Sequence, residues 1–235
     1  MYATELIILY DKVTERIMRV DSRYNGTAYE FVGFRGLVIM YLPVAQNTPW
    51  QQTTDIDLSH AAVVVVDILG GKGGVVPGLE GMADCAVQIV KAARAKQMPV
   101  IFCNDAHLPV IDKEIQLWGD HGIVDTDSAQ PLEAFDVQDT DFIIPKRRYD
   151  GFFQTDLDLT LRELGIDTLI VFGCDTNICV MQTLAGAFYR GYKTIVPADA
   201  CGTFLIGTQE DGLTYFTRCF DSRVVDTETV LGYLA

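Results

Sequence analysis

The chain has 235 residues, of which 49% are hydrophobic and 10% aromatic, and this composition excludes an intrinsically disordered protein. It carries 32 acidic and 18 basic residues, and the net charge of −14 argues against nucleic acid and membrane partners, because an acidic surface repels phosphate groups. No apolar run reaches the roughly 18 residues that a membrane span requires.

Residues 1–60 are predicted to form a β-rich extension followed by a linker. Asn25-Gly26 is a hairpin signal, and short runs rich in Ile, Val, Tyr and Phe lie at residues 4–10, 15–22, 27–34 and 36–42. Residues 43–60 are polar and contain two prolines, which is typical of a linker. We expect the extension to enlarge an oligomer interface or to cover a neighbouring active site, because exposed strand edges need cover.

Residues 61–235 alternate between buried strands and amphipathic helices. The predicted strands lie at residues 61–67, 99–105, 141–146, 168–173, 193–199 and 222–226. The predicted helices lie at residues 81–97, 155–165, 176–190, 208–220 and 227–234. This order predicts an α/β fold, a three-layer αβα sandwich around a six-stranded, mainly parallel sheet.

The six cysteines are spread through apolar surroundings without a CxxC pair. The N-terminus lacks a basic region and carries Glu5 inside its apolar stretch, so it is a poor signal peptide. These features predict a reduced, cytoplasmic protein in which most thiols are buried. A redox pair of Cys174 and Cys179 is the alternative to a packed Cys174 thiol.

Reactive side chains follow several of the predicted strands at the edge where ligands of parallel sheets bind. They are Asp67, Asp105 with His107 two residues later, Lys146, Cys179 and Asp199. Cys179 lies in the first turn of a predicted helix, where the helix dipole lowers a thiol pKa and favours thiolate. Asp67 is suited to accept its proton and Lys146 to stabilise the thiolate, which makes a coherent nucleophilic set. The competing interpretation is a cysteine packed in the core.

Three segments carry a family resemblance: VVVVD at 63–67, KRRYDGFFQTDLD at 146–158 and GCDTNICVMQTLAGAFYRGYKTIVPADA at 173–200. Residues 61–235 resemble the isochorismatase-like cysteine hydrolases, a family that includes N-carbamoylsarcosine amidases and nicotinamidases. The resemblance implies Asp67, Lys146 and Cys179 as a catalytic triad and a cis peptide bond before Asp175. It also implies an oxyanion hole made by the backbone N–H groups of Asp175 and Cys179.

The resemblance further implies a divalent metal beside the nucleophile, with Asp105, His107, Glu114 and His121 as ligands. Zinc suits such mixed histidine and carboxylate ligands, and no organic cofactor is expected. The alternative is that these four are loop residues that make ordinary hydrogen bonds.

Other residues around the expected site have two interpretations each. Trp118 and Phe152 suit the aromatic wall of an amide pocket, or the core in the case of Phe152. Arg148, like its neighbour Arg147, suits a substrate carboxylate or pairs with one of the many acids. The glycine-rich segment 70–74 fits no phosphate-binding motif and is interpreted as a loop over the active site.

The sequence therefore predicts an amidohydrolase that cleaves a small amide or N-carbamoyl compound through a thioester, and a homo-oligomer, which the family tends to form. One alternative is vinyl-ether hydrolysis of the isochorismatase type, although that branch commonly lacks the cysteine that stands here at position 179. The other is a non-catalytic domain on the same fold that binds a ligand or serves in assembly.

Overall fold

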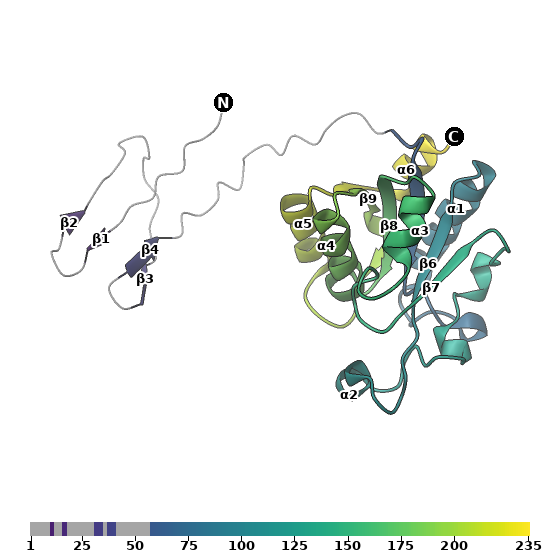
Figure 1. Cartoon of the computed structure of the whole chain (residues 1–235), viewed down its shortest axis with the longest axis horizontal. Coiled ribbons are helices and arrows are strands. Elements are labelled where there is room, and N and C mark those ends of the chain that lie inside the picture. Colours follow the sequence, from purple (N-terminus) through teal and green to yellow (C-terminus); the bar gives the residue numbers. More distant parts are fainter. Residues whose placement is uncertain (1–9, 12–15, 18–30, 35–36, 41–56) are drawn as a thin grey trace. The chain divides into compact units, whose positions relative to one another are not determined.

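A computed structural model describes residues 57–235 with their side chains and, before them, four short strands (Figure 1). The chain divides into two compact units, residues 1–51 and 52–235, and the division falls inside the predicted linker. The strands of the first unit pair antiparallel in the order β2-β1-β4-β3 and are β1 (Tyr10–Asp11), β2 (Arg16–Ile17), β3 (Phe31–Phe34) and β4 (Leu37–Met40). The predicted turn at Asn25-Gly26 and the linker before residue 57 lie outside the described residues.

The second unit is built on a parallel sheet of seven strands. Their order is β11-β9-β8-β5-β6-β7, with β10 paired to β8 beyond this path. The strands are β5 (Ala61–Val66), β6 (Val100–Asp105), β7 (Phe142–Lys146), β8 (Thr168–Cys174), β9 (Lys193–Pro197), β10 (Cys201–Gly202) and β11 (Arg223–Val225). The predicted α/β fold is confirmed, and the seventh strand is β10, whose two residues are too short to produce a periodic pattern.

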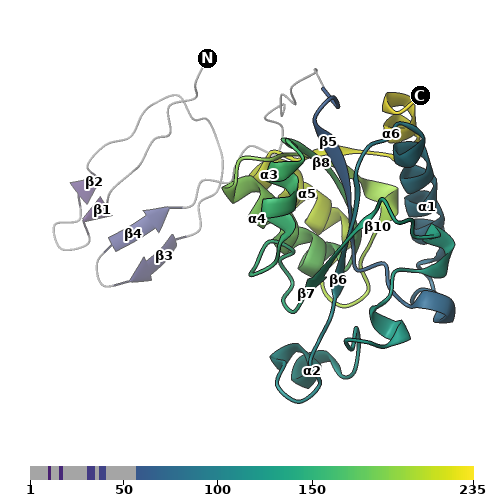
Figure 2. The same ribbon diagram turned by 45° about the vertical axis from the view of Figure 1, so that its right-hand side comes forward.

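Helices cover both faces of this sheet. Figure 2 shows α1 and α6 on one side and α3, α4 and α5 on the other, which completes the three layers. The helices are α1 (Glu80–Ala95), α2 (Lys113–Trp118), α3 (Leu157–Glu163), α4 (Met181–Tyr189), α5 (Gln209–Phe220) and α6 (Thr227–Tyr233). Within α1 the buried side chains recur every three or four residues from Met82 to Ala93, the spacing of a helix with one apolar face.

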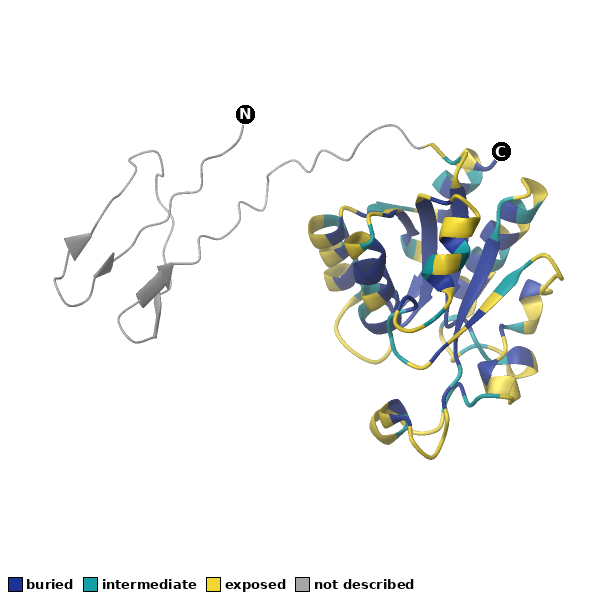
Figure 3. Ribbon diagram, viewed as in Figure 1, coloured by how far each residue is buried: buried dark blue, intermediate teal, exposed yellow. Residues whose placement is uncertain are grey.

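Hydrophobic burial is concentrated in the central strands, as Figure 3 shows. Every residue of β5, β6 and β8 is buried, which explains their continuous apolar runs. The helices keep exposed outer faces. None of the described helices combines the length and the apolar character needed to span a membrane.

The strand order changes direction next to β5. The chain runs outward from β5 through β6 to β7, and then returns to β8 on the other side of β5. In sheets of this kind a crevice opens at the carboxyl ends of the strands where the order reverses. The fold thereby places the segments that follow β5 and β8 at one site.

Candidate active site

Four reactive side chains meet at the carboxyl-terminal edge of the sheet. Asp67 follows β5, while Asp105 and Lys146 end β6 and β7 and are neighbours in the register of these two strands. Cys179 lies in a single π-helical turn, Thr176–Val180, that links β8 to α4. The sequence predicts an uninterrupted helix from residue 176 to 190, whereas the structure forms this turn first and α4 after it.

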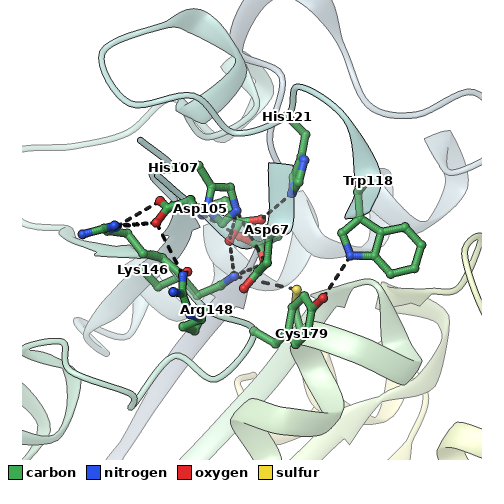
Figure 4. Close-up of polar contacts among 12 residues, drawn as sticks. Asp67, Asp105, His107, Trp118, His121, Lys146, Arg148 and Cys179 are labelled. Atoms are coloured by element: carbon green, nitrogen blue, oxygen red, sulfur yellow. Dashed lines mark hydrogen bonds and ion pairs between the residues drawn. The ribbon is translucent and has the colours of Figure 1, made fainter. Parts of the chain in front are cut away.

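The ammonium group of Lys146 is fully buried among the other three side chains (Figure 4). Its Nζ lies 2.6 Å from Asp67 Oδ2 and 3.7 Å from Cys179 Sγ, and it donates to Asp105 Oδ1. The backbone N–H of Asp105 donates to Asp67 Oδ1 over 2.8 Å and fixes that carboxylate. Because a buried cation is tolerated only when it is paired, the two carboxylates hold Lys146 beside the thiol.

Burial raises the pKa of two members of this cluster, Asp67 and Cys179. Burial, together with the nearby Asp105 carboxylate, raises the pKa of Asp67 to about 7, although Lys146 opposes the shift. Burial also raises the pKa of the Cys179 thiol well above its usual value, and the lowering effect of Lys146 does not compensate. This differs from the expectation that the helix dipole favours thiolate, because the thiol is enclosed instead of facing water. These two shifts favour a thiol at Cys179 with the Asp67 carboxyl group beside it as the acceptor of its proton.

The turn that carries Cys179 begins at Asp175, and the peptide bond between Cys174 and Asp175 is cis, as the resemblance implies. Asp175 Oδ1 accepts the backbone N–H of Asn177 over 2.8 Å, which caps the turn. Asp175 and Cys179 both line the cavity described below. The oxyanion hole assigned to their N–H groups stays a prediction. Cys174 Sγ donates to the carbonyl oxygen of Asp67 over 2.9 Å, a packed thiol with a hydrogen bond.

Next to this cluster the structure brings the predicted metal ligands together. The ligand atoms of Asp105, His107 and His121 all lie within 4.8 Å of one another. His107 Nε2 lies 3.5 Å from Asp105 Oδ1 and 3.6 Å from Glu114 Oε2, while His121 Nε2 lies 3.9 Å from Asp105 Oδ2. Glu114 therefore borders the group through His107.

These residues fit a divalent cation. Both ring nitrogens of His107 and both carboxylate oxygens of Glu114 are buried without a hydrogen-bond partner among the described residues. Buried polar atoms seldom lack a hydrogen bond. A bound cation would give partners to His107 Nε2 and Glu114 Oε2, which lie 3.6 Å apart. His121 Nδ1 lies 2.7 Å from the carbonyl oxygen of Gly119, which leaves its Nε2 free to bind a metal.

Arg147 and Arg148 are directed to Asp112 and not to the cavity. Arg147 Nε lies 3.0 Å from Asp112 Oδ2, and Arg148 Nη1 lies 3.5 Å from Asp112 Oδ1. The same carboxylate lies 3.5 Å from His107 Nδ1 and is positioned to orient the imidazole ring. The position of Arg148 therefore agrees with pairing to an acid and not with binding a substrate carboxylate.

A cavity of about 400 Å³ opens above Asp67 and Cys179. Trp118 lines it, and the Trp118 indole N–H donates to the Tyr149 hydroxyl, which lines it too, over 3.0 Å. Gly70 and Gly74 also border the cavity, in agreement with a glycine-rich loop over the site. Trp118 belongs to α2, a helix of six residues that the sequence does not predict because its pattern is too short.

Two candidates lie away from the cavity. Phe152 is buried against the Tyr192 ring, at a centroid distance of 5.7 Å, and beneath the Arg190 guanidinium, so it occupies the core alternative. Asp199 accepts from the backbone N–H and the hydroxyl of Thr227, the first residue of α6, instead of joining the other acids. Neither residue lines the cavity.

Part of the cavity lining is not predicted from the sequence. Phe204 and Leu205 border the cavity from the segment after β10, and Ile178 borders it from the turn before the nucleophile. Phe204 and Leu205 lie in no regular element, so periodicity gives no signal for them. They are held at the cavity by Asp175, whose carboxylate accepts their backbone N–H groups, and this contact is visible only in the folded structure.

Comparisons with known proteins agree with this fold and site. The isochorismatase domain family matches residues 61–229. The uncharacterized isochorismatase family protein YwoC of Bacillus subtilis is 35% identical over 188 residues, which is 74% of this chain and 95% of that protein.

Two further relatives carry names that describe an activity. A ureidoacrylate amidohydrolase of Methylorubrum extorquens is 45% identical over 69 residues, which is 29% of this chain and 28% of that protein. The crystal structure of N-carbamoylsarcosine amidase from Thermoplasma acidophilum is 33% identical with a TM-score of 0.66, and the match covers 72% of this chain and 96% of that one.

Proposed function

This chain belongs to the isochorismatase family, and from that premise we propose that it is a cysteine-dependent amidohydrolase. Its substrate is a small amide or an N-carbamoyl compound, as for an N-carbamoylsarcosine amidase or a nicotinamidase, and the reaction passes through a thioester. The observation that carries the proposal is the position of Lys146 Nζ, 2.6 Å from Asp67 Oδ2 and 3.7 Å from Cys179 Sγ, two residues that line a cavity.

The first half of the reaction forms the thioester. Asp67, whose pKa of about 7 suits proton exchange near neutrality, accepts the thiol proton of Cys179. The thiolate attacks the carbonyl carbon, and the backbone N–H groups of Asp175 and Cys179 stabilise the oxyanion. The carbon–nitrogen bond then breaks, Asp67 returns the proton to the leaving nitrogen, and the acyl group stays on sulfur.

The second half of the reaction releases the acyl group. Asp67 takes a proton from water, and the resulting hydroxide attacks the thioester carbon. The carbon–sulfur bond breaks, Cys179 recovers its proton and the acid product leaves. Throughout, the Lys146 ammonium holds the Asp67 carboxylate in place and stabilises negative charge on sulfur.

We also propose that Asp105, His107 and His121, with Glu114 beside them, hold a divalent ion, most suitably zinc. When bound, such an ion supplies a Lewis acid next to the nucleophile. Neighbouring groups orient the two imidazole rings that would bind the ion. Asp112 lies against His107 Nδ1, and the Gly119 carbonyl oxygen contacts His121 Nδ1.

The proposal is tested by ammonia release from nicotinamide, N-carbamoylsarcosine and a panel of ureido acids and small amides. We expect wild-type protein to release ammonia from at least one compound, and Cys179→Ser and Cys179→Ala to lose at least about a thousandfold in rate. Cys219→Ser, which changes an exposed cysteine on α5, serves as the matched control and keeps the wild-type rate. Full activity in both Cys179 variants would refute the mechanism.

A further inference from the structure

We propose that the cavity selects an uncharged substrate with an apolar acyl or amine group and rejects substrates that carry a carboxylate there. The inference rests on the proposed amidohydrolase function and narrows it: among the proposed amides and N-carbamoyl compounds, it favours the uncharged ones over ureido acids such as N-carbamoylsarcosine. It is drawn from the distribution of charged and apolar side chains around the cavity.

Much of the cavity wall is apolar. Its apolar residues come from two segments far apart in sequence, the one between β5 and α1 and the one after β10, and include Leu69, Val75, Val76, Leu79, Phe204 and Leu205. Several of these side chains are partly exposed, with Leu205 at 45% and Phe204 at 46%, so they present apolar surface to whatever enters the cavity. An apolar group placed against them removes that surface from water, which favours its binding.

No arginine or lysine lines the cavity among residues 57–235, whereas five acids do: Asp67, Asp105, Glu114, Asp120 and Asp175. The Lys146 ammonium is already shared between two of these carboxylates, and both neighbouring arginines face Asp112. A substrate carboxylate would therefore lose its water, meet negative charge and find no cationic side chain in the described part of the chain.

A divalent ion at the proposed metal site would add positive charge at the reactive end of the cavity, so the charge preference is tested with and without added zinc. Its ligands Asp105, His107 and His121 lie at the reactive end, where the scissile carbonyl must reach Cys179. Glu114, beside His107, adds a carboxylate at this end of the cavity, and the Asp67 carboxylate there is paired with Lys146.

The apolar wall after β10 is anchored. The Asp175 carboxylate accepts the Thr203 hydroxyl over 2.9 Å and the backbone N–H groups of Phe204 and Leu205 over 2.7 and 3.0 Å. These bonds hold the two apolar side chains at the cavity and occupy the Asp175 oxygens. The same carboxylate that caps the nucleophile turn therefore also positions part of the substrate wall.

Two isosteric pairs test the inference, because each pair exchanges an isopropyl group for a carboxylate and keeps the scissile bond. The amide pair is 4-methylpentanamide and succinamate, and the urea pair is isobutylurea and N-carbamoylglycine. Ammonia release from any of the four supports the proposed function. The ratio of kcat/KM within a pair, with and without added zinc, tests the charge preference, and we expect the neutral member to lead by about tenfold or more.

Binding to Cys179→Ala protein, measured by calorimetry, gives the same ratio without turnover, so a failure of catalysis leaves this inference testable. Tighter binding or faster turnover of the carboxylate member would overturn it. Equal values within both pairs would overturn it as well.

A charge-reversal variant locates the preference. Leu205→Lys places an ammonium on the wall and is expected to shift the ratio toward the carboxylate member by about tenfold. Ile206→Lys is the matched control, because Ile206 is exposed at 58%, adjoins Leu205 in sequence and does not line the cavity. An unchanged ratio in Leu205→Lys, or the same shift in both variants, would contradict the assignment.

Discussion

His107 is fully buried, and neither of its ring nitrogens has a hydrogen-bond partner within residues 57–235. The carboxylate oxygens of Glu114 also lack a hydrogen-bond partner there, and Glu114 lies beside His107, which borders Asp105. Two buried polar side chains without a hydrogen bond at one place are costly unless a ligand satisfies them. At the scale of single residues this is the observation that supports a metal.

We therefore expect purified protein to hold about one divalent ion per chain by elemental analysis, and His107→Ala to lose it. Asp112→Asn removes a carboxylate that lies 3.5 Å from His107 Nδ1, and is expected to weaken metal affinity by about 10- to 100-fold. His60→Ala, at an exposed position before β5, is the control and keeps the metal. Wild-type protein that takes up no metal after incubation with zinc would contradict the site.

Residue types alone predict part of this site. Asp67, Lys146 and Cys179 stand out because they lie at or after the ends of predicted strands and can together activate a thiol, but only the family resemblance favours this interpretation over a cysteine packed in the core. Phe152 illustrates the limit, since an aromatic residue near a reactive lysine suits a pocket and a core equally well. Only the tertiary packing against Tyr192 and Arg190 decides between them.

At the scale of elements, the segment between β10 and α5 depends on the turn that carries the nucleophile. Asn177 Nδ2 lies 3.1 Å from Thr203 Oγ1, 2.6 Å from the Ile206 oxygen and 3.1 Å from the Thr208 oxygen. One amide group therefore connects the turn before α4 to the whole of this segment. No helix or strand period reports such a connection, so sequence analysis missed it.

Asn177→Ala removes these hydrogen bonds and leaves backbone oxygens without their donor. We expect it to lower the free energy of unfolding by about 1–3 kcal/mol and to raise KM more than it lowers kcat. Denaturant unfolding and steady-state kinetics measure the two effects. Gln88→Ala, which removes a single exposed bond on α1, should change stability by less than about 0.5 kcal/mol. A KM equal to that of wild type would show that the segment does not shape the substrate site.

At the scale of the whole molecule, the site exists because the strand order reverses beside β5. Because of that reversal, β6 and β7 lie on one side of β5, and β8, β9 and β11 lie on the other. A crevice opens there at the edge where Asp67 and Cys179 meet. The alternation of apolar strands and amphipathic helices in the sequence predicts a parallel sheet covered by helices. It does not predict the order of the strands within that sheet. The role of residues 1–60 and the expected homo-oligomer stay predictions.

The most direct test of the account is to detect the acyl group on Cys179 during turnover. The protein is mixed with a substrate that it hydrolyses, quenched in acid within milliseconds, digested with a protease and analysed by mass spectrometry. The account predicts that the peptide containing Cys179 gains the mass of the acyl group, and that the adduct disappears when substrate is exhausted. Ammonia release at the full rate without any adduct on this peptide, together with retained activity in Cys179→Ala, would contradict it.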